Sequence, residues 1–447
     1  MNKETRGQQI LDCLAQNSML KLRQCLEELH AADIAEFLPQ LPLPQRIKIL
    51  RLVEHSKAAA ILFELDRDLL PPLLEGLGPK RTADIMSQMF TDDAADLLGE
   101  LPEEQQNKLL GLMKAAEAED IRDLLSYDVD TAGGLMATEY VDVRKDFTAN
   151  QAIERLRRIA PGAETVYYVY VTNDDEQLVG VISLRELIIA DPEEKIENIM
   201  RTQVVSVHVR TDQEEVAKLV SKYDMLAVPV VNNDKQLLGI ITFDDIIDVI
   251  EEEATEDMMR LAGNIEPEGQ DLESSFWRRA GNRLPWLIGL LFGELVAGNV
   301  IHGFSATLEH ITALAFFITA MAGGPGNAAT QSLTVVVRGL ATGQIDKSKI
   351  WSVVWKETQV GILVGLTCGL TLAVMAYIWQ GSPTLGLVVG LSMTFSITTA
   401  TVLGSLVPVV ISRLGVDPAM ASGPFIATLM DITSMMIYFG LATMFLI

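Results

Sequence analysis

The stretch AMASGPFIATLMDITSMMIYFGLATMFLI, residues 419–447, decides how the C-terminal part of the chain folds. It is longer than the about 20 apolar residues that a helix needs to cross a bilayer, and its one charged side chain is Asp431. Near its start, Gly423-Pro424 predicts a loosened helical ladder, because proline has no N–H to donate. We therefore expect a membrane-spanning helix with a carboxylate near the bilayer midplane.

A charge at that depth costs about 2.5 kcal/mol or more, so Asp431 needs a compensating interaction. The structural interpretation is a carboxyl group that forms a hydrogen bond with a neighbouring helix. The functional interpretation is a cation site inside the membrane. Both interpretations fit this stretch on its own.

The charge of the chain is divided unevenly between its two parts. From Arg278 onward there are eight Lys or Arg and six Asp or Glu residues, whereas the preceding part has 27 basic and 54 acidic residues. The front of the chain is therefore soluble and acidic, which disfavours nucleic acid as a partner and attracts cations. An acidic surface also serves solvation alone, so a divalent-cation sensor is one of two interpretations.

Four more apolar runs precede the last one, and together they predict five transmembrane helices. The runs cover residues 284–304, 311–337, 360–379, 385–414 and 420–447. Basic residues precede the first run and follow the second and the fourth, at Arg278, Arg279, Arg283, Arg338, Lys347, Lys349, Lys356 and Arg413. Because positive charge collects on the cytoplasmic side, we expect the soluble front in the cytoplasm and the C-terminus outside.

Two further features of these runs concern an ion path. The second run contains Gly323-GPGNAATQS, which predicts an interrupted helix whose freed carbonyls and Asn327 offer oxygen ligands to a hard cation. Close packing of small residues between helices is the alternative. Glu294 lies about as deep in the first run as Asp431 in the last, and it is either a second acid of the site or a neutral, hydrogen-bonded side chain.

Residues 1–130 predict an all-helical domain with a loose internal repeat. The stretches ILFELDRDLLPPLLEGL (from Ile61) and IMSQMFTDDAADLLGEL (from Ile85) each predict a helix, a polar or proline-containing turn and a second helix. Such short helices bury their apolar faces by stacking into a superhelical bundle, which usually binds or transduces. The acids Asp92, Asp93 and Asp96 suit a hard cation, but helix N-capping explains them as well.

Residues 131–250 contain a second repeat. YYVYVTNDDEQLVGVISLRELI (from Tyr167) matches MLAVPVVNNDKQLLGIITFDDII (from Met225), and each copy predicts a strand, an acidic turn, a strand and a helix. The repeat resembles a tandem pair of CBS domains, a module that commonly binds adenine nucleotides. In that module a hydroxyl and a carboxylate of the pattern G-x-x-[ST]-x-x-[DE] lie near the ribose and phosphate. The pattern occurs at Gly180, Ser183 and Glu186, and again at Gly239, Thr242 and Asp245.

Residues 244–277 predict an acidic connecting helix and a linker that overlap the end of the second repeat. Ile246 and Val249 belong to an apolar stripe, and six acids crowd the other faces, namely Asp245, Asp248, Glu252, Glu253, Glu256 and Asp257. Like charges three or four residues apart destabilise a helix by about 0.2–0.5 kcal/mol a pair, and a bound cation relieves that repulsion. A solvated face is the alternative, but the position between the soluble front and the first span favours a function.

Motifs of catalysis do not occur in the sequence. It has no G-x-x-x-x-G-K-[ST] loop for ATP hydrolysis and no Ser/His/Asp or Cys/His grouping. We therefore expect no catalytic residue and a protein that is not an enzyme.

In its order of parts, the whole chain resembles the MgtE family of magnesium channels. The most specific stretches are DTAGGLM (130–136), ETVYYVYV (164–171), EEEATEDM (251–258), VVRGLATG (336–343) and LGVDPAMASGPFIATLMD (414–431). The resemblance implies a multidomain membrane protein. Its parts are an α-helical superhelical N-domain (1–130), α/β tandem CBS domains (131–250), a connecting plug helix and linker (244–277) and a five-helix transmembrane pore domain (278–447).

The resemblance also implies a mechanism. Family members are homodimers in the lipid of the bacterial cell (inner) membrane, and both subunits form the pore. The carboxylate that matches Asp431 holds a hydrated Mg²⁺, helped by a backbone carbonyl at Ala427, and the connecting helix is a plug that bound Mg²⁺ holds closed. The sensing positions would be Asp92, Asp96, Glu214, Asp224, Asp245, Asp248, Glu253, Glu256 and Asp257, with Asp417 facing the plug.

Regulatory ATP binding is a further implication of the resemblance. Its positions match Tyr168, Arg185, Glu186, Val205, Met225, Ala227 and Pro229. Met225 departs from the aromatic residue that stacks there in some members. Ala329 and Thr330 replace Gly and Asn of the second span, and Gly423 replaces an Asn.

We therefore expect a Mg²⁺-selective channel or transporter for magnesium uptake, closed by cytosolic Mg²⁺ bound between N-domain, CBS and plug elements and modulated by ATP. The alternative is a CBS-regulated transporter of another divalent cation, Co²⁺, Mn²⁺ or Ni²⁺. A CBS-regulated anion transporter would need a cationic lining, whereas the charges at depth are acidic. A receptor without transport would need an output module, which the sequence does not show.

Overall fold

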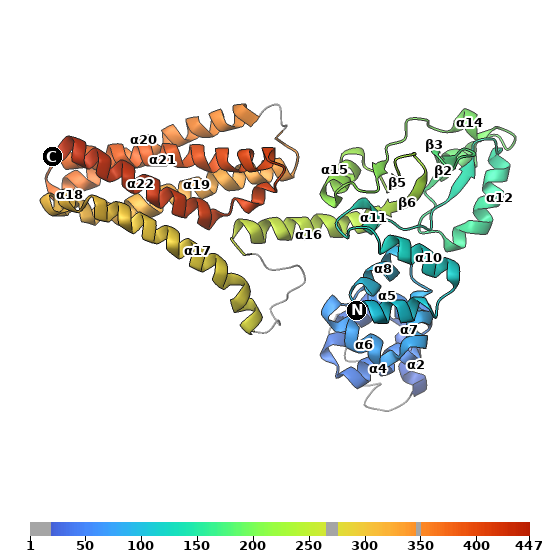
Figure 1. The fold of residues 1–447 in the computed structure, drawn as a ribbon. Coiled ribbons are helices and arrows are strands. Elements are labelled where there is room, and N and C mark those ends of the chain that lie inside the picture. The colour runs from blue at the N-terminus through green and yellow to red at the C-terminus, as the bar shows by residue number, and fades with distance from the viewer. Residues whose placement is uncertain (1–18, 265–275, 346–349) are drawn as a thin grey trace. The chain divides into compact units, whose positions relative to one another are not determined.

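The computed structural model describes residues 19–264, 276–345 and 350–447. Residues 1–18 of the predicted N-domain, 265–275 of the predicted linker, and Lys347 and Lys349 lie outside the described residues. The chain forms two compact units, Met1–Ile250 and Glu251–Ile447 (Figure 1).

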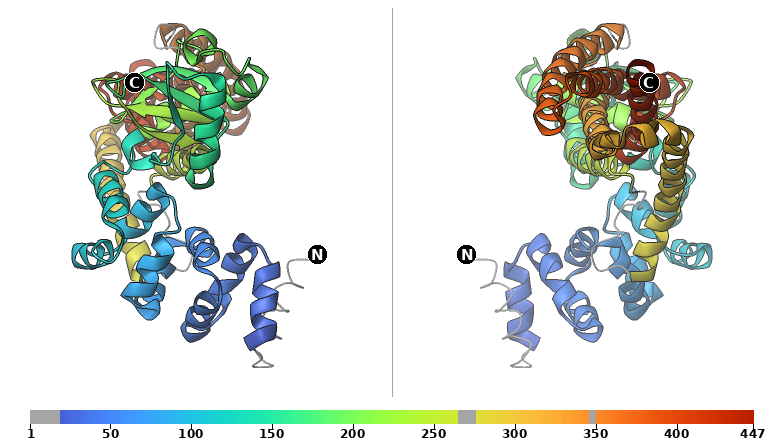
Figure 2. Two further views of the ribbon diagram at one scale, coloured as in Figure 1. Left: turned by 90° about the vertical axis from the view of Figure 1, so that its right-hand side faces the viewer. Right: turned by 90° about the vertical axis from the view of Figure 1, so that its left-hand side faces the viewer.

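The first unit begins with a row of short helices (Figure 2). They are α2 (Met19–Glu28), α3 (Ala31–Phe37), α4 (Leu43–Leu52), α5 (His55–Phe63), α6 (Leu70–Leu77), α7 (Pro79–Met86), α8 (Thr91–Gly99), α9 (Glu103–Leu110) and α10 (Ala115–Leu124), with 3-10 turns η1 (Leu38–Gln40) and η2 (Arg67–Leu69). Proline lies in the first turn of α4, α6 and α7, where its missing N–H costs nothing. Between α6 and α7, Gly78 has a φ of +85°, which glycine adopts without strain. The predicted series of short amphipathic helices is confirmed.

Two similar α/β repeats follow in the same unit. The first contains α11 (Ala132–Leu135), β1 (Asp142–Arg144), α12 (Ala149–Ile159), η3 (Ala160–Gly162), β2 (Tyr168–Thr172), β3 (Leu178–Ser183), α13 (Leu184–Ile189) and α14 (Ile196–Ile199). The second contains β4 (Val207–His208), α15 (Gln213–Tyr223), β5 (Ala227–Val231), β6 (Leu237–Thr242) and α16 (Phe243–Leu261). In each sheet the middle strand pairs parallel with the first strand and antiparallel with the third. The predicted strand–turn–strand–helix repeat is therefore confirmed.

Reciprocal contacts join the two repeats. The N–H of Leu178 donates to the carbonyl of Lys235 at 2.9 Å, and the N–H of Leu237 donates to that of Glu176 at 3.3 Å. A continuous apolar core extends from the N-terminal helices into the second repeat, where it includes Val228. The short helices and both repeats therefore fold as one compact unit.

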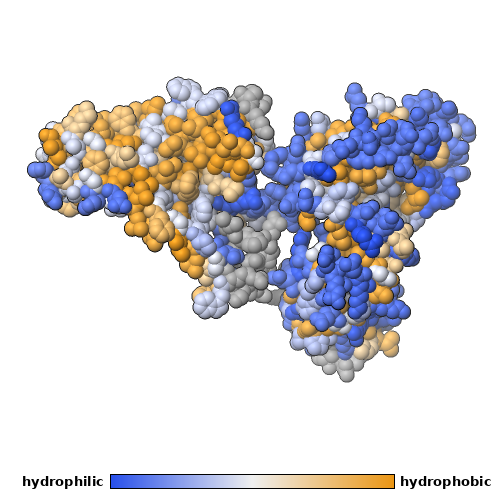
Figure 3. Space-filling view, viewed as in Figure 1, coloured by the Kyte–Doolittle hydropathy of each residue, from blue (hydrophilic) through white to orange (hydrophobic). Residues whose placement is uncertain are grey.

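The second unit consists of long apolar helices. After the end of α16 they are α17 (Phe276–Gly303), α18 (Ser305–His310), η4 (Thr312–Phe317), α19 (Ile318–Ala341), α20 (Ile350–Gln380), α21 (Pro383–Arg413), η5 (Pro418–Met420) and α22 (Gly423–Leu446). Figure 3 shows the apolar surface over these helices. Four segments are long and apolar enough to cross a membrane, namely Arg279–Gly303, Ile350–Gln380, Pro383–Arg413 and Gly423–Leu446. The fifth predicted span coincides with α19, whose 24 residues suffice in length, but the count of five stays a prediction.

The predicted interruption of the second span is wrong. Helix α19 continues through Gly323 and contains Pro325 in its interior, and the irregular part is η4 just before it. Gly326 lies where α19 packs on α22, since a Cβ on it would be in ordinary van der Waals contact with the Cβ of Ala427 at 3.4 Å, whereas a Cβ on Gly323 would have open space.

Helices α20 and α21 pack through a row of glycines. A Cβ on Gly369 would lie 2.5 Å from the carbonyl oxygen of Gly390, and one on Gly365 would lie 2.8 Å from that of Thr394. The Thr394 hydroxyl donates across the interface to the carbonyl of Gly365 at 3.1 Å. This close backbone approach is the small-residue packing typical of membrane helices.

Replacing Gly369 by alanine should lower the thermal unfolding midpoint of the full-length protein in detergent, because the added methyl meets backbone that cannot move aside. The matched control is Gly298→Ala on α17, where the added Cβ has open space. We expect Gly369→Ala to lower the free energy of unfolding by about 1–3 kcal/mol, as in overpacked cores, and the control to leave it unchanged. Equal midpoints would contradict this account of the packing.

Candidate cation path and regulatory clefts

Asp431 lies on α22, about two turns after the helix begins, and is half-buried. The helix begins at Ser422, whose hydroxyl accepts the N–H of Phe425 at 3.4 Å. Gly423 and Pro424 form the first turn, so the predicted loosening of the ladder is wrong: a proline in this position removes no helical hydrogen bond. Asp431 is therefore presented by a regular, capped helix.

Residues of two other helices, α17 and α19, lie beside this part of α22. The carbonyl oxygen of Ala427, one turn before Asp431, would lie 3.8 Å from a Cβ on Gly326 of α19. Asn327 on α19 is exposed in the single chain. The carboxyl group of Glu294 on α17 lies within hydrogen-bonding range of that of Asp431. The structure thus brings Glu294 and Asp431 together.

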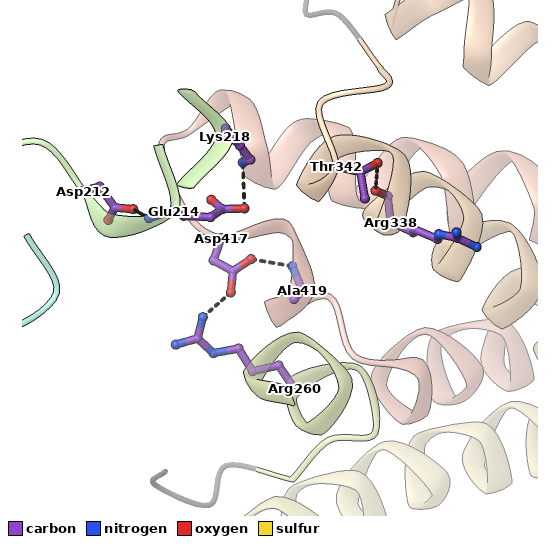
Figure 4. A network of polar contacts seen from close by, with 8 residues as sticks. All are labelled: Asp212, Glu214, Lys218, Arg260, Arg338, Thr342, Asp417 and Ala419. Carbon is purple, nitrogen blue, oxygen red and sulfur yellow. Dashed lines mark hydrogen bonds and ion pairs between the residues drawn. The ribbon is translucent and has the colours of Figure 1, made fainter. Parts of the chain in front are cut away.

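The end of α16 contacts the loop before α22 (Figure 4). Arg260 forms ion pairs with Asp417 and with Glu256, and the other carboxylate oxygen of Asp417 accepts the N–H of Ala419 at 2.8 Å. Asp417 thus contacts the end of α16. Its partner there is an arginine of the chain itself, which sequence reasoning missed.

Two more close contacts join the end of α16 and the residues after it to the long helices. A Cβ on Gly423 would lie 3.3 Å from the carbonyl oxygen of Leu261 and 3.1 Å from the Thr330 methyl group. A Cβ on Gly263 would lie 2.5 Å from the indole nitrogen of Trp286. Gly423 and Thr330 are thus neighbours at the point where α16 ends.

The two α/β repeats present the same hydroxyl–carboxylate pair. In the first, the Ser183 hydroxyl donates to Glu186 at 2.7 Å; in the second, the Thr242 hydroxyl donates to Asp245 at 2.5 Å. The backbone N–H of each hydroxyl residue donates to the same carboxylate oxygen. The repeated motif therefore forms equivalent local structures at the start of α13 and of α16.

The electrostatic surroundings of these two carboxylates are opposite. Hydrogen bonds from Ser183 and the guanidinium of Arg201, 2.6 Å away, lower the pKa of Glu186 to about 2. Burial and the neighbouring acid Asp244 raise the pKa of Asp245 to about 6, despite its bonds from Thr242. The first repeat therefore offers a cation beside its carboxylate, and the second offers further acids.

The acids around Asp245 come from the N-terminal helices as well as from the repeats. Burial raises the pKa of Asp92 well above its usual value, and it raises that of Asp93 to about 7 and that of Glu164 to about 8, with neighbouring carboxylates contributing to each shift. One oxygen of Glu164 is buried without a hydrogen-bond partner. Crowded, poorly solvated carboxylates favour a proton or a cation between them.

Helix capping does not account for these acids. The residue before α8 is Phe90, which makes no side-chain cap, and Asp92 and Asp93 lie in the first turn. Sequence reasoning assigned no role to Glu139, which accepts the Thr91 hydroxyl at 2.8 Å, or to Glu164. The conspicuous stretch ETVYYVYV contains Glu164, but only the fold places that residue near α8.

The other predicted sensing residues are spread over the chain. Asp96 lies 3.9 Å from Arg67, Glu214 lies 2.6 Å from Lys218, and Asp224 ends α15 in a left-handed conformation. Asp248, Glu253 and Asp257 lie on α16 and have interactions of their own. Among the residues that the structure describes, no three His, Cys, Asp or Glu side chains form a group arranged to hold a metal ion. The predicted ligands therefore do not form a closed coordination shell.

The predicted nucleotide residues lie on both repeats. Tyr168 belongs to β2 and packs in an apolar cluster with Ile240 of β6. The remaining positions are Arg185 and Glu186 on α13, Val205 before β4, Met225 after α15, and Ala227 and Pro229 on β5.

Long apolar helices, one with a carboxylate about two turns from its start, follow the paired α/β repeats, and this combination indicates a membrane protein of the cation-transporter class. Family profiles agree: one described as a divalent cation transporter matches residues 318–441, the MgtE intracellular N domain matches 29–130, and the CBS domain matches 132–193 and 196–252. The chain belongs to the MgtE family.

Similar proteins extend over nearly the whole chain. The magnesium transporter MgtE of Bacillus subtilis is 38% identical over 439 residues, which are 98% of this chain and 96% of the relative. That of Thermus thermophilus is 38% identical over 444 residues, 97% of each chain. A solved cytosolic domain of the Mg²⁺ channel MgtE in complex with ATP is 38% identical, has a TM-score of 0.53, and covers 54% of this chain and 99% of its own. The predicted family is thereby confirmed.

The crowded acids predict how stability depends on pH. Because the folded-state pKa values of Asp93, Glu164 and Asp245 lie above their unfolded values, the folded unit binds more protons than the unfolded chain. This contribution to stability is complete below about pH 4 and is lost as pH rises to about 8. With a chelator present, the unfolding midpoint of the full-length protein should be lower at pH 8 than at pH 6, and millimolar Mg²⁺ should raise it most at pH 8.

Glu164→Gln is the control, because it removes one of the crowded charges and should flatten the pH dependence. If the unfolding midpoint of the wild-type protein rises between pH 6 and pH 8, the crowding of these carboxylates does not control its stability.

Proposed function

We propose that this chain is a Mg²⁺-selective channel or transporter for magnesium uptake, with Asp431 as the carboxylate that holds the permeating ion. The observation that carries the proposal is the half-buried Asp431, the one charged residue of α22, in a chain whose relatives over nearly the full length are named magnesium transporters. Two subunits form the pore, with the soluble front in the cytoplasm of a bacterial cell and the C-terminus outside.

The chemistry of Mg²⁺ fits this site. Mg²⁺ prefers octahedral oxygen coordination and gives up its water reluctantly. One carboxylate from each subunit of a homodimer, with the Ala427 carbonyl and the Asn327 amide nearby, binds the hydrated ion through its waters. Because water molecules fill most coordination positions, the protein does not have to supply a complete set of ligands. The described residues of the single chain contain no such set.

Asp431→Ala should abolish most Mg²⁺ uptake into liposomes that contain the full-length protein, because the one charged group of α22 is removed. The assay is an internal Mg²⁺ indicator, with Co²⁺, Mn²⁺ and Ni²⁺ offered separately to test the alternative cations. Glu309→Gln, at an exposed position of α18, is the control and should transport like the wild type. Undiminished uptake by Asp431→Ala would refute the site.

For regulation, we propose that cytosolic Mg²⁺ binds among the acids of the N-domain, the CBS repeats and α16 and favours the closed state. The support is the crowding of Asp92, Asp93, Glu164 and Asp245 in the first unit. When Mg²⁺ is scarce, their repulsion favours separation of these elements. Mg²⁺ shifts the equilibrium only by its preference for the closed state.

The end of α16 is the proposed plug, held by Arg260. Its pair with Asp417 is partly exposed, so it contributes about 1 kcal/mol. Arg260→Asp should raise the Mg²⁺ concentration that closes the pore roughly fivefold, the equivalent of that energy. The double variant Arg260→Asp/Asp417→Arg, which restores an ion pair with reversed charges, should return closure toward the wild-type value.

The experiment measures the rate of Mg²⁺ uptake while the Mg²⁺ concentration on the side of the soluble unit is varied. Unchanged closure in Arg260→Asp would exclude Arg260 from the plug. Neutralising Glu253, Glu256 and Asp257 together is expected to leave the pore open at high Mg²⁺.

ATP is the proposed modulator of this closure, bound by residues of both repeats. The support is the ATP complex of the solved relative and the cationic surroundings of Glu186, where Arg201 lies 2.6 Å away. Met225 in place of an aromatic residue is expected to weaken that binding.

A further inference from the structure

Glu294 is a carboxylate in an apolar environment. It lies on α17 among uncovered apolar side chains, of which Leu291 is 60% and Leu295 is 58% exposed. A charge on such a helix requires a partner. Among the described residues, no lysine or arginine forms an ion pair with Glu294 or Asp431, and the group that Glu294 approaches is the Asp431 carboxyl.

The approach of the two acids is fixed by packing. A Cβ on Gly293, next to Glu294, would lie 2.4 Å from the methyl group of Thr428 on α22. The Thr428 hydroxyl donates to the carbonyl of Pro424 at 3.0 Å, which holds that side chain in place. Helix α17 therefore meets α22 one turn before Asp431 because residue 293 has no side chain.

We propose that Glu294 is a second, specificity-determining carboxylate of the permeation site, which acts together with Asp431 on a hydrated divalent cation. The inference rests on the proposed function of Asp431. Two carboxylates in contact repel each other, and a dication between or beside them relieves this repulsion. A monovalent ion gains half as much from each charge, so the pair discriminates by valence.

Glu294→Gln tests the inference, because glutamine keeps the shape and a hydrogen bond to Asp431 but loses the charge. We expect the half-saturating Mg²⁺ concentration for uptake by full-length protein in liposomes to rise roughly tenfold, the order of one Coulombic contact through water. Selectivity for Mg²⁺ over K⁺ should fall roughly threefold, because K⁺ carries half the charge. Glu294→Asp keeps the charge and should largely restore both values.

The matched control is Glu357→Gln on α20. It removes another carboxylate of this unit, one that accepts the Ser332 hydroxyl at 2.8 Å, and should leave the half-saturating concentration unchanged. Gly293→Ala is a second test that keeps both acids and separates α17 from α22; it should raise the half-saturating concentration as well. Unfolding midpoints in detergent identify any variant that fails to fold.

An active Glu294→Gln protein with wild-type half-saturation and selectivity would overturn the inference. So would a lower maximal uptake at unchanged half-saturation, since that indicates structural support only. Absence of Mg²⁺ uptake by the wild-type protein would overturn the proposed function itself, and this inference with it.

Discussion

Repulsion between carboxylates that cannot be fully solvated is the interaction on which this molecule depends. In the first unit, Asp92, Asp93, Glu164 and Asp245 crowd together where burial already disfavours their charge. In the second unit, Glu294 approaches Asp431 among apolar helices. Such arrangements persist only where the rest of the fold holds them, and each gains stability when a cation or proton is shared.

The two CBS repeats show how one backbone can acquire two opposite electrostatic surroundings. Both place a hydroxyl and a carboxylate at the start of a helix with the same hydrogen bonds. Arg201 gives Glu186 of the first repeat a cationic neighbour, whereas Asp244 and Asp93 of α8 surround Asp245 of the second with further acids. The two repeats therefore share one local geometry and differ in the charged residues around it.

Much of the architecture was predictable because it depends on local patterns. The stacked helices, the repeated strand–turn–strand–helix and the acidic helix α16 follow from hydrophobic period and turn residues. The predicted break at Gly323 failed because glycine and proline inside a helix of this kind lower its stability without ending it. Gly423-Pro424 was misinterpreted because its position relative to the helix start, set by Ser422, decides what proline does.

Contacts between segments far apart in the chain could not be predicted from the sequence. Asp431 was evident from its depth in an apolar run, but the arrangement of Glu294 beside it depends on how α17 packs on α22. Arg260 lies in the same helix as the predicted plug acids, yet only the fold shows that it pairs with Asp417. Such pairs join residues far apart in the sequence, and neither hydrophobic periodicity nor a local motif shows that two such residues are close in space.

The central claim is that the ion which permeates also closes the path. Initial Mg²⁺ uptake into liposomes should be measured while Mg²⁺ on the side of the soluble unit is varied and the driving gradient is held constant. The account predicts that uptake falls to a low level as that concentration rises into the millimolar range. Uptake that is independent of Mg²⁺ on that side would contradict it.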